Sequence, residues 1–276
     1  MKIPVFATIG GSFRFFWNHR VQFYYLALPP VVLLAILFAM AGSDWSLPPK
    51  LNQPHTFKML ETPDAETIWR SVSGLGAFMI MVIVFPLYSV AWHRSYLIQN
   101  EQGTIGSCYR WRWRHWSFLW SMIKISLILL PVFLVGGLFT SFLAAAFPPV
   151  AILLMPILII FVFICYGRFS LWLPAAAVDH KMTLQQVLAL TRGNGGRLSV
   201  ILVLTGLAVG ILNAVANVGI GIAAGSLSMV GSLTQSLLTN LALYLIMYAG
   251  MAVGISALSK AYKLLIDQEQ PAGPAI

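Results

Sequence analysis

Long apolar runs without charge constrain this chain more than any other feature of its sequence. No Asp, Glu, Lys or Arg occurs from 21 to 40, from 125 to 167 or from 198 to 259. A helix needs about 20 apolar residues to cross a hydrocarbon core of about 30 Å. Backbone groups in lipid must bond internally, and the runs lack the alternation of a membrane β-strand. The runs therefore predict helices that span a membrane.

Composition supports the same class of protein. Of the 276 residues, 59% are hydrophobic and 9% are charged, whereas a soluble domain is about 45–50% apolar and about 25% charged. We predict an all-α, polytopic integral membrane protein that forms a single transmembrane domain over residues 1–276. Its six predicted spans are 21–42, 72–92, 121–146, 150–167, 198–224 and 232–259.

The basic residues predict the orientation. With the N-terminus in the cytoplasm, 14 Lys and Arg residues fall on the cytoplasmic side, and only Lys50, Lys58 and Arg70 fall on the other. Cytoplasmic loops carry an excess of Lys and Arg, so both termini are expected inside. The first apolar run starts only after residue 20 and exceeds the roughly 7–15 residues of a signal-peptide core. We therefore expect it to be an uncleaved helix.

Three similar segments precede the three predicted hairpins. Residues 8–20 and 104–116 both begin with Thr-Ile-Gly, with Arg six and Trp nine residues after the Thr. Residues 183–194 share the Thr and a basic residue nine positions later. We predict a cytoplasmic interfacial helix before each hairpin, with chance similarity as the alternative. The apolar spacing in 183–194 also suits a helix packed under the bundle.

The last two spans carry small residues and amides that suit helix packing. Close approach of small residues and hydrogen bonds between polar side chains hold membrane helices together. We predict two glycine ridges and an amide contact between the helices, with a polar substrate site as the alternative. The packing residues are Gly206, Gly210, Gly250, Gly254, Asn213, Asn217 and Asn240.

The most concentrated chemical feature is the alternation of Arg and Trp over residues 109–116. Guanidinium groups bind phosphates bidentately, and Trp favours the membrane interface. The segment therefore predicts contact with anionic lipid or a membrane protein partner, with ordinary anchoring as the alternative. Because the adjacent span keeps these residues at the membrane, no nucleic-acid partner is expected. The predicted binding residues are Arg110, Arg112, Arg114, Trp111, Trp113, Trp116, Arg14, Arg20, Arg168 and Arg192.

Signals for catalysis, cofactors or metals are lacking in the sequence. Apart from Lys124 near the start of the span 121–146, no Asp, Glu, Lys, Arg or His falls inside a predicted span, which argues against an ion-coupled pump or a selective ion channel. The five histidines show no ligand spacing, and no phosphate loop or nucleophile motif occurs. Asp179 and His180 are adjacent, and a solvated loop suits them better than a catalytic pair. We therefore expect no enzyme, no cofactor and no metal site.

A stretch near the middle of the chain resembles a known group of proteins. It is Arg168–Asp179, with Thr183-Leu184 and Thr191-Arg192-Gly193-Asn194 after it. It resembles a pattern in bacterial six-helix inner-membrane proteins related to the glycerophosphoryl diester phosphodiesterase membrane domain. The resemblance implies a bacterial inner-membrane location and a role near lipid or the envelope. It carries no enzymatic activity, because the chain leaves no residues for the fused catalytic barrel of that family.

Three functional hypotheses follow from these features. The first is a non-catalytic inner-membrane module that engages anionic lipid of the cytoplasmic leaflet, or a membrane partner, through its Arg and Trp side chains. The second is a transporter or permease for a neutral or hydrophobic solute that uses the Asn amides of the last two spans. The third is an accessory or assembly subunit of a membrane complex, or a homo-oligomer.

Overall fold

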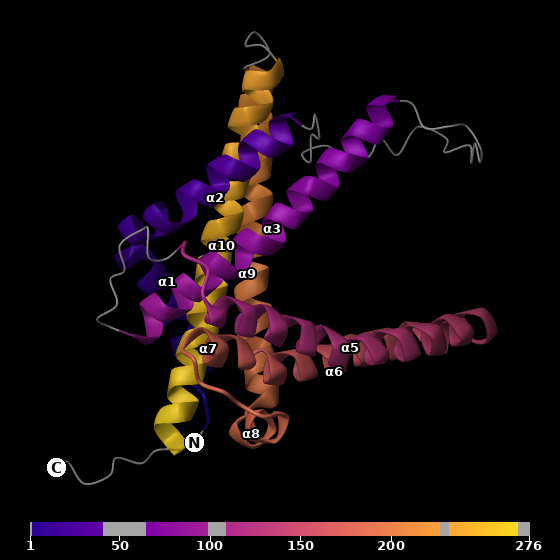
Figure 1. Ribbon diagram of the computed structural model, residues 1–276. Helices are drawn as coiled ribbons and strands as arrows, with labels where there is room; N and C mark the ends of the chain where they lie inside the picture. Colours follow the sequence, from indigo (N-terminus) through magenta and orange to yellow (C-terminus); the bar gives the residue numbers. More distant parts are fainter. Residues whose placement is uncertain (1, 41–64, 99–108, 227–231, 270–276) are drawn as a thin grey trace, which may run out of the picture. The chain divides into compact units, whose positions relative to one another are not determined.

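The computed structural model describes residues 2–40, 65–98, 109–226 and 232–269, and these residues are helical with short connections and no strand. Figure 1 labels the helices. In chain order they are α1 (Val5–Asn18), α2 (Arg20–Met40), α3 (Ala65–Leu97), α5 (Trp113–Ala146), α6 (Pro148–Phe169), α7 (Trp172–Ala177), α8 (Leu184–Leu190), α9 (Gly195–Ser226) and α10 (Ser232–Glu269).

Six of these helices, α2, α3, α5, α6, α9 and α10, are long and apolar enough to cross a membrane. The structure thus confirms an all-α, polytopic membrane protein. The predicted helix ends are less accurate than the number of spans. Helix α10 continues past the predicted end of its span at residue 259 to Glu269, because charged residues can extend a helix beyond the membrane. The extension carries Lys260 and Lys263.

The chain divides into two compact units, which are described separately. Unit 1 comprises Met1–Arg20, Pro86–Ala208 and Ala252–Ile276, and unit 2 comprises Val21–Phe85 and Val209–Met251. Every basic residue predicted to be cytoplasmic belongs to unit 1. The single transmembrane domain over 1–276 stays a prediction.

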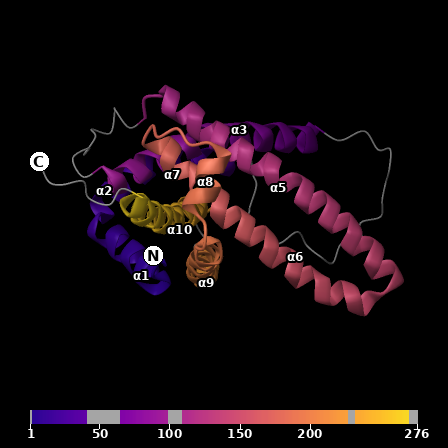
Figure 2. The same cartoon turned by 90° about the horizontal axis from the view of Figure 1, so that it is seen from below.

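Helix α8 belongs to the core of unit 1. Val187 is fully buried and packs with Ile125 and Leu129 of α5 and with Trp172 of α7. Figure 2 shows α7 and α8 beside the base of the α5–α6 hairpin. Thr183 caps the helix, because its hydroxyl accepts from the Gln186 N–H, an arrangement that satisfies a free donor of the first turn. Of the two alternatives for residues 183–194, the structure favours a helix packed under the bundle.

The segments before the hairpins differ from one another more than the repeat predicts. Helices α1 and α8 precede the first and third hairpins. In the second segment, residues 104–108 lie outside the described residues, and 109–112 are not helical. Helix α5 begins at Trp113, eight residues before the predicted span at 121. The Trp residues from 113 onward therefore belong to the first turns of the spanning helix itself.

The four glycines predicted to pack the last two spans differ in how closely a neighbouring helix approaches them. In unit 2, a Cβ added at Gly250 would overlap the side chain of Val209, so the two helices approach closely there. A Cβ at Gly206, Gly210 or Gly254 would meet open space, so the structure shows a close approach at only one glycine of the four.

Two Asn side chains of the last two spans make hydrogen bonds within their own helices. The Asn217 amide donates to the Asn213 carbonyl oxygen at 2.7 Å, and the Asn240 amide donates to the Ser236 hydroxyl at 3.3 Å. Both bonds lie within a single helix. The predicted amide contact between the two helices stays a prediction.

Candidate functional site

Three Trp side chains line one face at the start of α5. Trp113, Trp116 and Trp120 are spaced at helical intervals of three and four residues, and their exposed fractions are 79%, 53% and 55%. With Ser117 they border a largely apolar cavity of about 470 Å³. Exposed indoles at the entry of a span are typical of the membrane–water interface. We call these three residues, with Arg110 and Arg112, the α5 entry surface.

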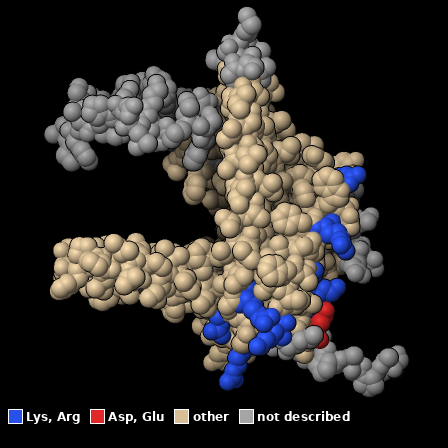
Figure 3. Space-filling view, turned by 180° about the vertical axis from the view of Figure 1, so that it is seen from behind, with Lys and Arg blue, Asp and Glu red and all other residues tan. Residues whose placement is uncertain are grey.

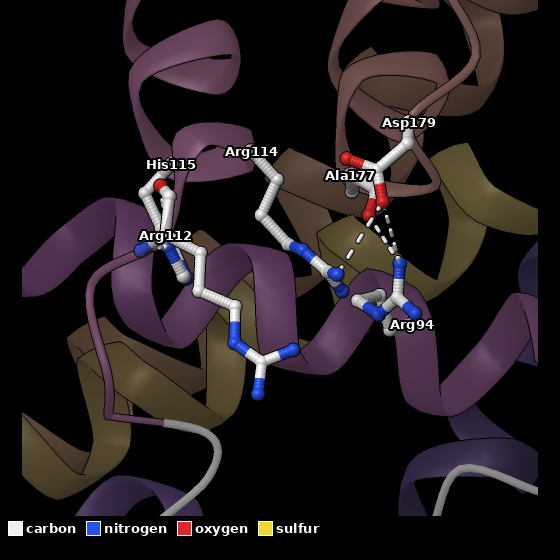
Figure 4. Close-up of polar contacts among 6 residues, drawn as sticks. All are labelled: Arg94, Arg112, Arg114, His115, Ala177 and Asp179. Atoms are coloured by element: carbon white, nitrogen blue, oxygen red, sulfur yellow. Dashed lines mark hydrogen bonds and ion pairs between the residues drawn. The ribbon is translucent and has the colours of Figure 1, made fainter.

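Arg110 and Arg112 are both exposed immediately before α5. The backbone N–H of Arg112 donates to Nδ1 of the buried His115 at 2.9 Å. This bond holds the turn from which the Arg112 side chain extends. In Figure 4 the Arg112 guanidinium lies apart from the ion pairs of its neighbours. Two guanidinium groups are thus presented beside the exposed indoles.

Arg114 is placed differently from the other two arginines of the segment. Its guanidinium lies 3.5 Å from a carboxylate oxygen of Asp179, and Arg94 lies 3.4 Å from the same oxygen (Figure 4). Arg94 also donates to the carbonyl oxygen of Ala177 at 3.1 Å. The structure therefore gives Arg114 an internal partner, and its predicted role in binding a lipid headgroup or a partner stays a prediction.

Asp179 holds this ion pair from a turn after α7. Its φ of 62° places it in the left-handed region, which Asp tolerates better than most residues. The carboxylate is 54% exposed, so solvent screens the pair and its contribution to stability is small. The next residue, His180, bonds through Nδ1 to the Tyr262 hydroxyl at 2.6 Å. Both side chains connect elements of unit 1.

Arg168 is also engaged inside unit 1. Its Nε donates to the Thr191 hydroxyl and a terminal nitrogen donates to the Leu188 carbonyl oxygen, both at 3.0 Å. Gly195 lies so close that a Cβ there would be 3.0 Å from the Arg168 side chain. The half-buried guanidinium thus caps the end of α8, and its predicted role in binding a lipid headgroup or a partner stays a prediction.

The segment that carries the family resemblance is a structural junction. Gly193 has a φ of 77°, which favours glycine. The Asn194 side-chain oxygen accepts from the Ile3 backbone N–H at 3.0 Å, and Arg197 donates to the Ile3 carbonyl oxygen at 2.8 Å. Within the Thr-Arg-Gly-Asn turn, the Arg192 side chain is exposed. The turn fastens the N-terminal residues to the start of α9.

The tryptophans Trp17, Trp92, Trp111 and Trp172 lie in different surroundings. Trp17 is exposed, and the Arg20 guanidinium lies 5.4 Å from its ring centre, a cation–π distance. Trp92 and Trp172 are buried, and their indole nitrogens donate inside unit 1, to Ala252 and Ser256 and to Met182 respectively. Those two buried residues anchor segments of unit 1 to one another. Trp111 is partly buried and its ring lies 5.4 Å from that of His115.

Sequence reasoning missed a second cavity, formed in unit 1 by α1, the end of α3 and the extension of α10. Its volume is about 490 Å³. Its cationic lining comes from two distant segments, because Arg14 lies on α1 whereas Lys260 and Lys263 lie on α10. Lys260 and Lys263 are three residues apart, which places them on one face of a helix. The span predicted from the sequence ends at 259 and therefore does not include this shared face, whereas α10 continues to Glu269. We call this cavity the α1–α10 pocket.

Basic side chains of unit 1 gather away from the far end of the α5–α6 hairpin, as Figure 3 shows. Among the residues that the structure describes, no group of His, Cys, Asp and Glu side chains could hold a metal ion.

Comparison with protein-family models, curated proteins and solved structures finds no match to this chain. The resemblance to the phosphodiesterase membrane domain therefore stays a hypothesis.

Proposed function

We propose that this protein is a non-catalytic module of the bacterial inner membrane that binds anionic lipid of the cytoplasmic leaflet through the α5 entry surface. Arg110 and Arg112 bind lipid phosphates, and Trp113, Trp116 and Trp120 set the depth of the helix. The observation that carries the proposal is the exposure of all five side chains together at the start of a spanning helix.

Charge and shape both suit a lipid headgroup. Each guanidinium can donate two parallel hydrogen bonds to one phosphate, and a basic side chain near an anionic surface contributes about 1 kcal/mol. The apolar cavity beside Ser117 accepts the glycerol and upper acyl region next to such a phosphate. We propose the same orientation as the sequence predicts, with both termini in the cytoplasm.

No cavity or exposed polar cluster that the structure describes supports the alternative of a transporter that uses the Asn amides. The amides of Asn217 and Asn240 bond within their own helices. A membrane protein partner could use the same exposed indoles, so the test of the proposal includes it as an outcome.

The first prediction concerns selective lipid retention. We expect Arg110→Gln with Arg112→Gln to reduce bound phosphatidylglycerol about fivefold to tenfold, because two charge-assisted contacts are lost. The full-length protein is incorporated into nanodiscs of equal phosphatidylcholine and phosphatidylglycerol. It is then extracted in mild detergent, and retained lipids are counted by native mass spectrometry.

A matched control removes two exposed cations elsewhere in unit 1, with Lys2→Gln and Lys181→Gln. Its net charge equals that of the arginine variant, so equal loss in both would show a general charge effect and contradict the proposal. Unchanged retention in the arginine variant would contradict it as well. A third outcome is that lipid retention is unchanged, while a protein co-purifies with the wild type and not with the arginine variant. That result would show that the α5 entry surface binds a protein partner and not lipid.

A further inference from the structure

The α1–α10 pocket brings three cations together. Among the residues that the structure describes, its lining includes Arg14, Lys260 and Lys263 and contains no Asp or Glu. Within the described part of the chain, the ion pairs recorded are those of Asp179 with Arg94 and Arg114, so the lysines and Arg14 are not paired with acids there. Three like charges around one cavity repel one another unless an anion enters.

Lys260 is held at the pocket by the backbone of α1. Its ammonium donates to the Ala7 carbonyl oxygen at 2.6 Å, which leaves two of its three donors for a ligand. The side chain crosses α1 at Gly11, where an added Cβ would overlap the ammonium. A glycine at this position lets the cation lie against the helix and face the cavity.

The remaining wall is aromatic and ordered. Phe15 stacks on His19 with ring centres 4.0 Å apart and contacts Tyr96 at 4.6 Å. The Nδ1 of His19 bonds to the Phe15 carbonyl oxygen at 2.9 Å, so Nε2 is the ring nitrogen left for a ligand. With Asn18 and the Tyr96 hydroxyl, the pocket offers neutral hydrogen-bonding groups beside its cations.

We propose that the α1–α10 pocket binds a phosphate group, with Arg14, Lys260 and Lys263 as its ligands. A phosphate dianion offsets two of the three positive charges of the lining. Arg can bind two of its oxygens, and each Lys acts as a point charge. A cavity of about 490 Å³ falls within the roughly 300–1,000 Å³ of small-molecule sites, so there is room for the group that carries the phosphate. This site does not depend on the α5 entry surface.

The phosphate can come from a soluble anion or from the headgroup of a lipid, and two assays distinguish these sources. The full-length protein in an uncharged detergent is titrated with inorganic phosphate by isothermal calorimetry. In parallel, it is mixed with phosphatidic acid in mixed micelles of the same detergent, and bound lipid is counted by native mass spectrometry. Binding in either assay identifies the source.

We expect Arg14→Gln with Lys263→Gln to weaken binding at least tenfold in whichever assay shows it, since charge-assisted hydrogen bonds of this kind are worth about tenfold or more each. Lys2→Gln with Lys181→Gln carries the same charge change and should bind as the wild type does. If the double variant does not fold, Lys263→Gln alone, at an exposed position of α10, should still weaken binding severalfold.

A second pair of variants tests the geometry without changing any charge. Gly11→Ala should weaken phosphate binding severalfold, because its methyl group displaces the Lys260 ammonium. Gly10→Ala is the matched control, since a Cβ at Gly10 meets open space. Absence of binding in both assays, or equal binding by the wild type and the Arg14 and Lys263 variants, would overturn the proposal. The variant Arg110→Gln with Arg112→Gln should lose retained phosphatidylglycerol and still bind phosphate in the α1–α10 pocket. This result would show that the two sites act independently, so that one proposal can fail without the other.

Discussion

Trp92→Ala is expected to destabilise unit 1 by about 3–5 kcal/mol, the usual cost of emptying a site filled by a large buried aromatic side chain. Trp92 is fully buried. Its Nε1 donates to the Ala252 carbonyl oxygen at 2.8 Å and to the Ser256 hydroxyl at 2.9 Å. Its ring also stacks near Tyr88, with centres 6.3 Å apart. The variant therefore loses packing and both bonds between α3 and α10.

Thermal unfolding in detergent, followed by circular dichroism, measures this effect. Trp113→Ala is the control, because the same side chain is removed from a position that is 79% exposed, and its melting temperature should stay close to that of the wild type. Trp92→Phe should fall between the two, since the ring is mostly kept and the indole donor is lost. Equal melting temperatures for Trp92→Ala and Trp113→Ala would show that Trp92 is not an anchor.

Arg168→Ala should cost about 3 kcal/mol. The guanidinium makes two hydrogen bonds at 3.0 Å, to Thr191 and to Leu188, and hydrogen bonds to charged groups contribute about 1.5–3 kcal/mol each. Its removal also leaves a space against Gly195. Lys at this position cannot reproduce the planar geometry that reaches both oxygens, so Arg168→Lys should recover only part of the loss.

Arg192→Gln is the matched control for Arg168, because this arginine of the same turn is exposed. A surface substitution of this kind changes stability by about 0.5 kcal/mol or less. Denaturation in sodium dodecyl sulfate, followed by tryptophan fluorescence, compares the variants. A similar shift for Arg168→Ala and Arg192→Gln would contradict the capping role.

The sequence predicts the helices well for a clear physical reason. Lipid permits few backbone structures, so a long uncharged run such as 125–167 has to form spanning helices, and a turn within it separates α5 from α6. The apolar spacing at Leu184, Val187 and Leu190 similarly predicts α8. In each case the signal lies within one short segment of the chain.

The candidate site is less predictable, because its properties depend on contacts between distant residues. Arg112 and Arg114 look equivalent in sequence, yet only Arg114 reaches Asp179. Trp92 and Trp113 both flank predicted spans, yet α10 covers the first and leaves the second exposed. The α1–α10 pocket joins Arg14 to Lys260 and Lys263, a combination that requires the fold of α1 against the end of α10.

The side of the membrane on which the basic surface of unit 1 lies is the claim on which the lipid proposal depends. In a variant with Cys108→Ser and Cys165→Ser, single cysteines replace either Phe147, exposed at the α5–α6 turn, or Lys181, exposed before α8. Spheroplasts are treated with a membrane-impermeant maleimide. We predict that Phe147→Cys is labelled at once and Lys181→Cys only after permeabilisation. Labelling of Lys181→Cys in intact spheroplasts, with Phe147→Cys protected, would contradict the account.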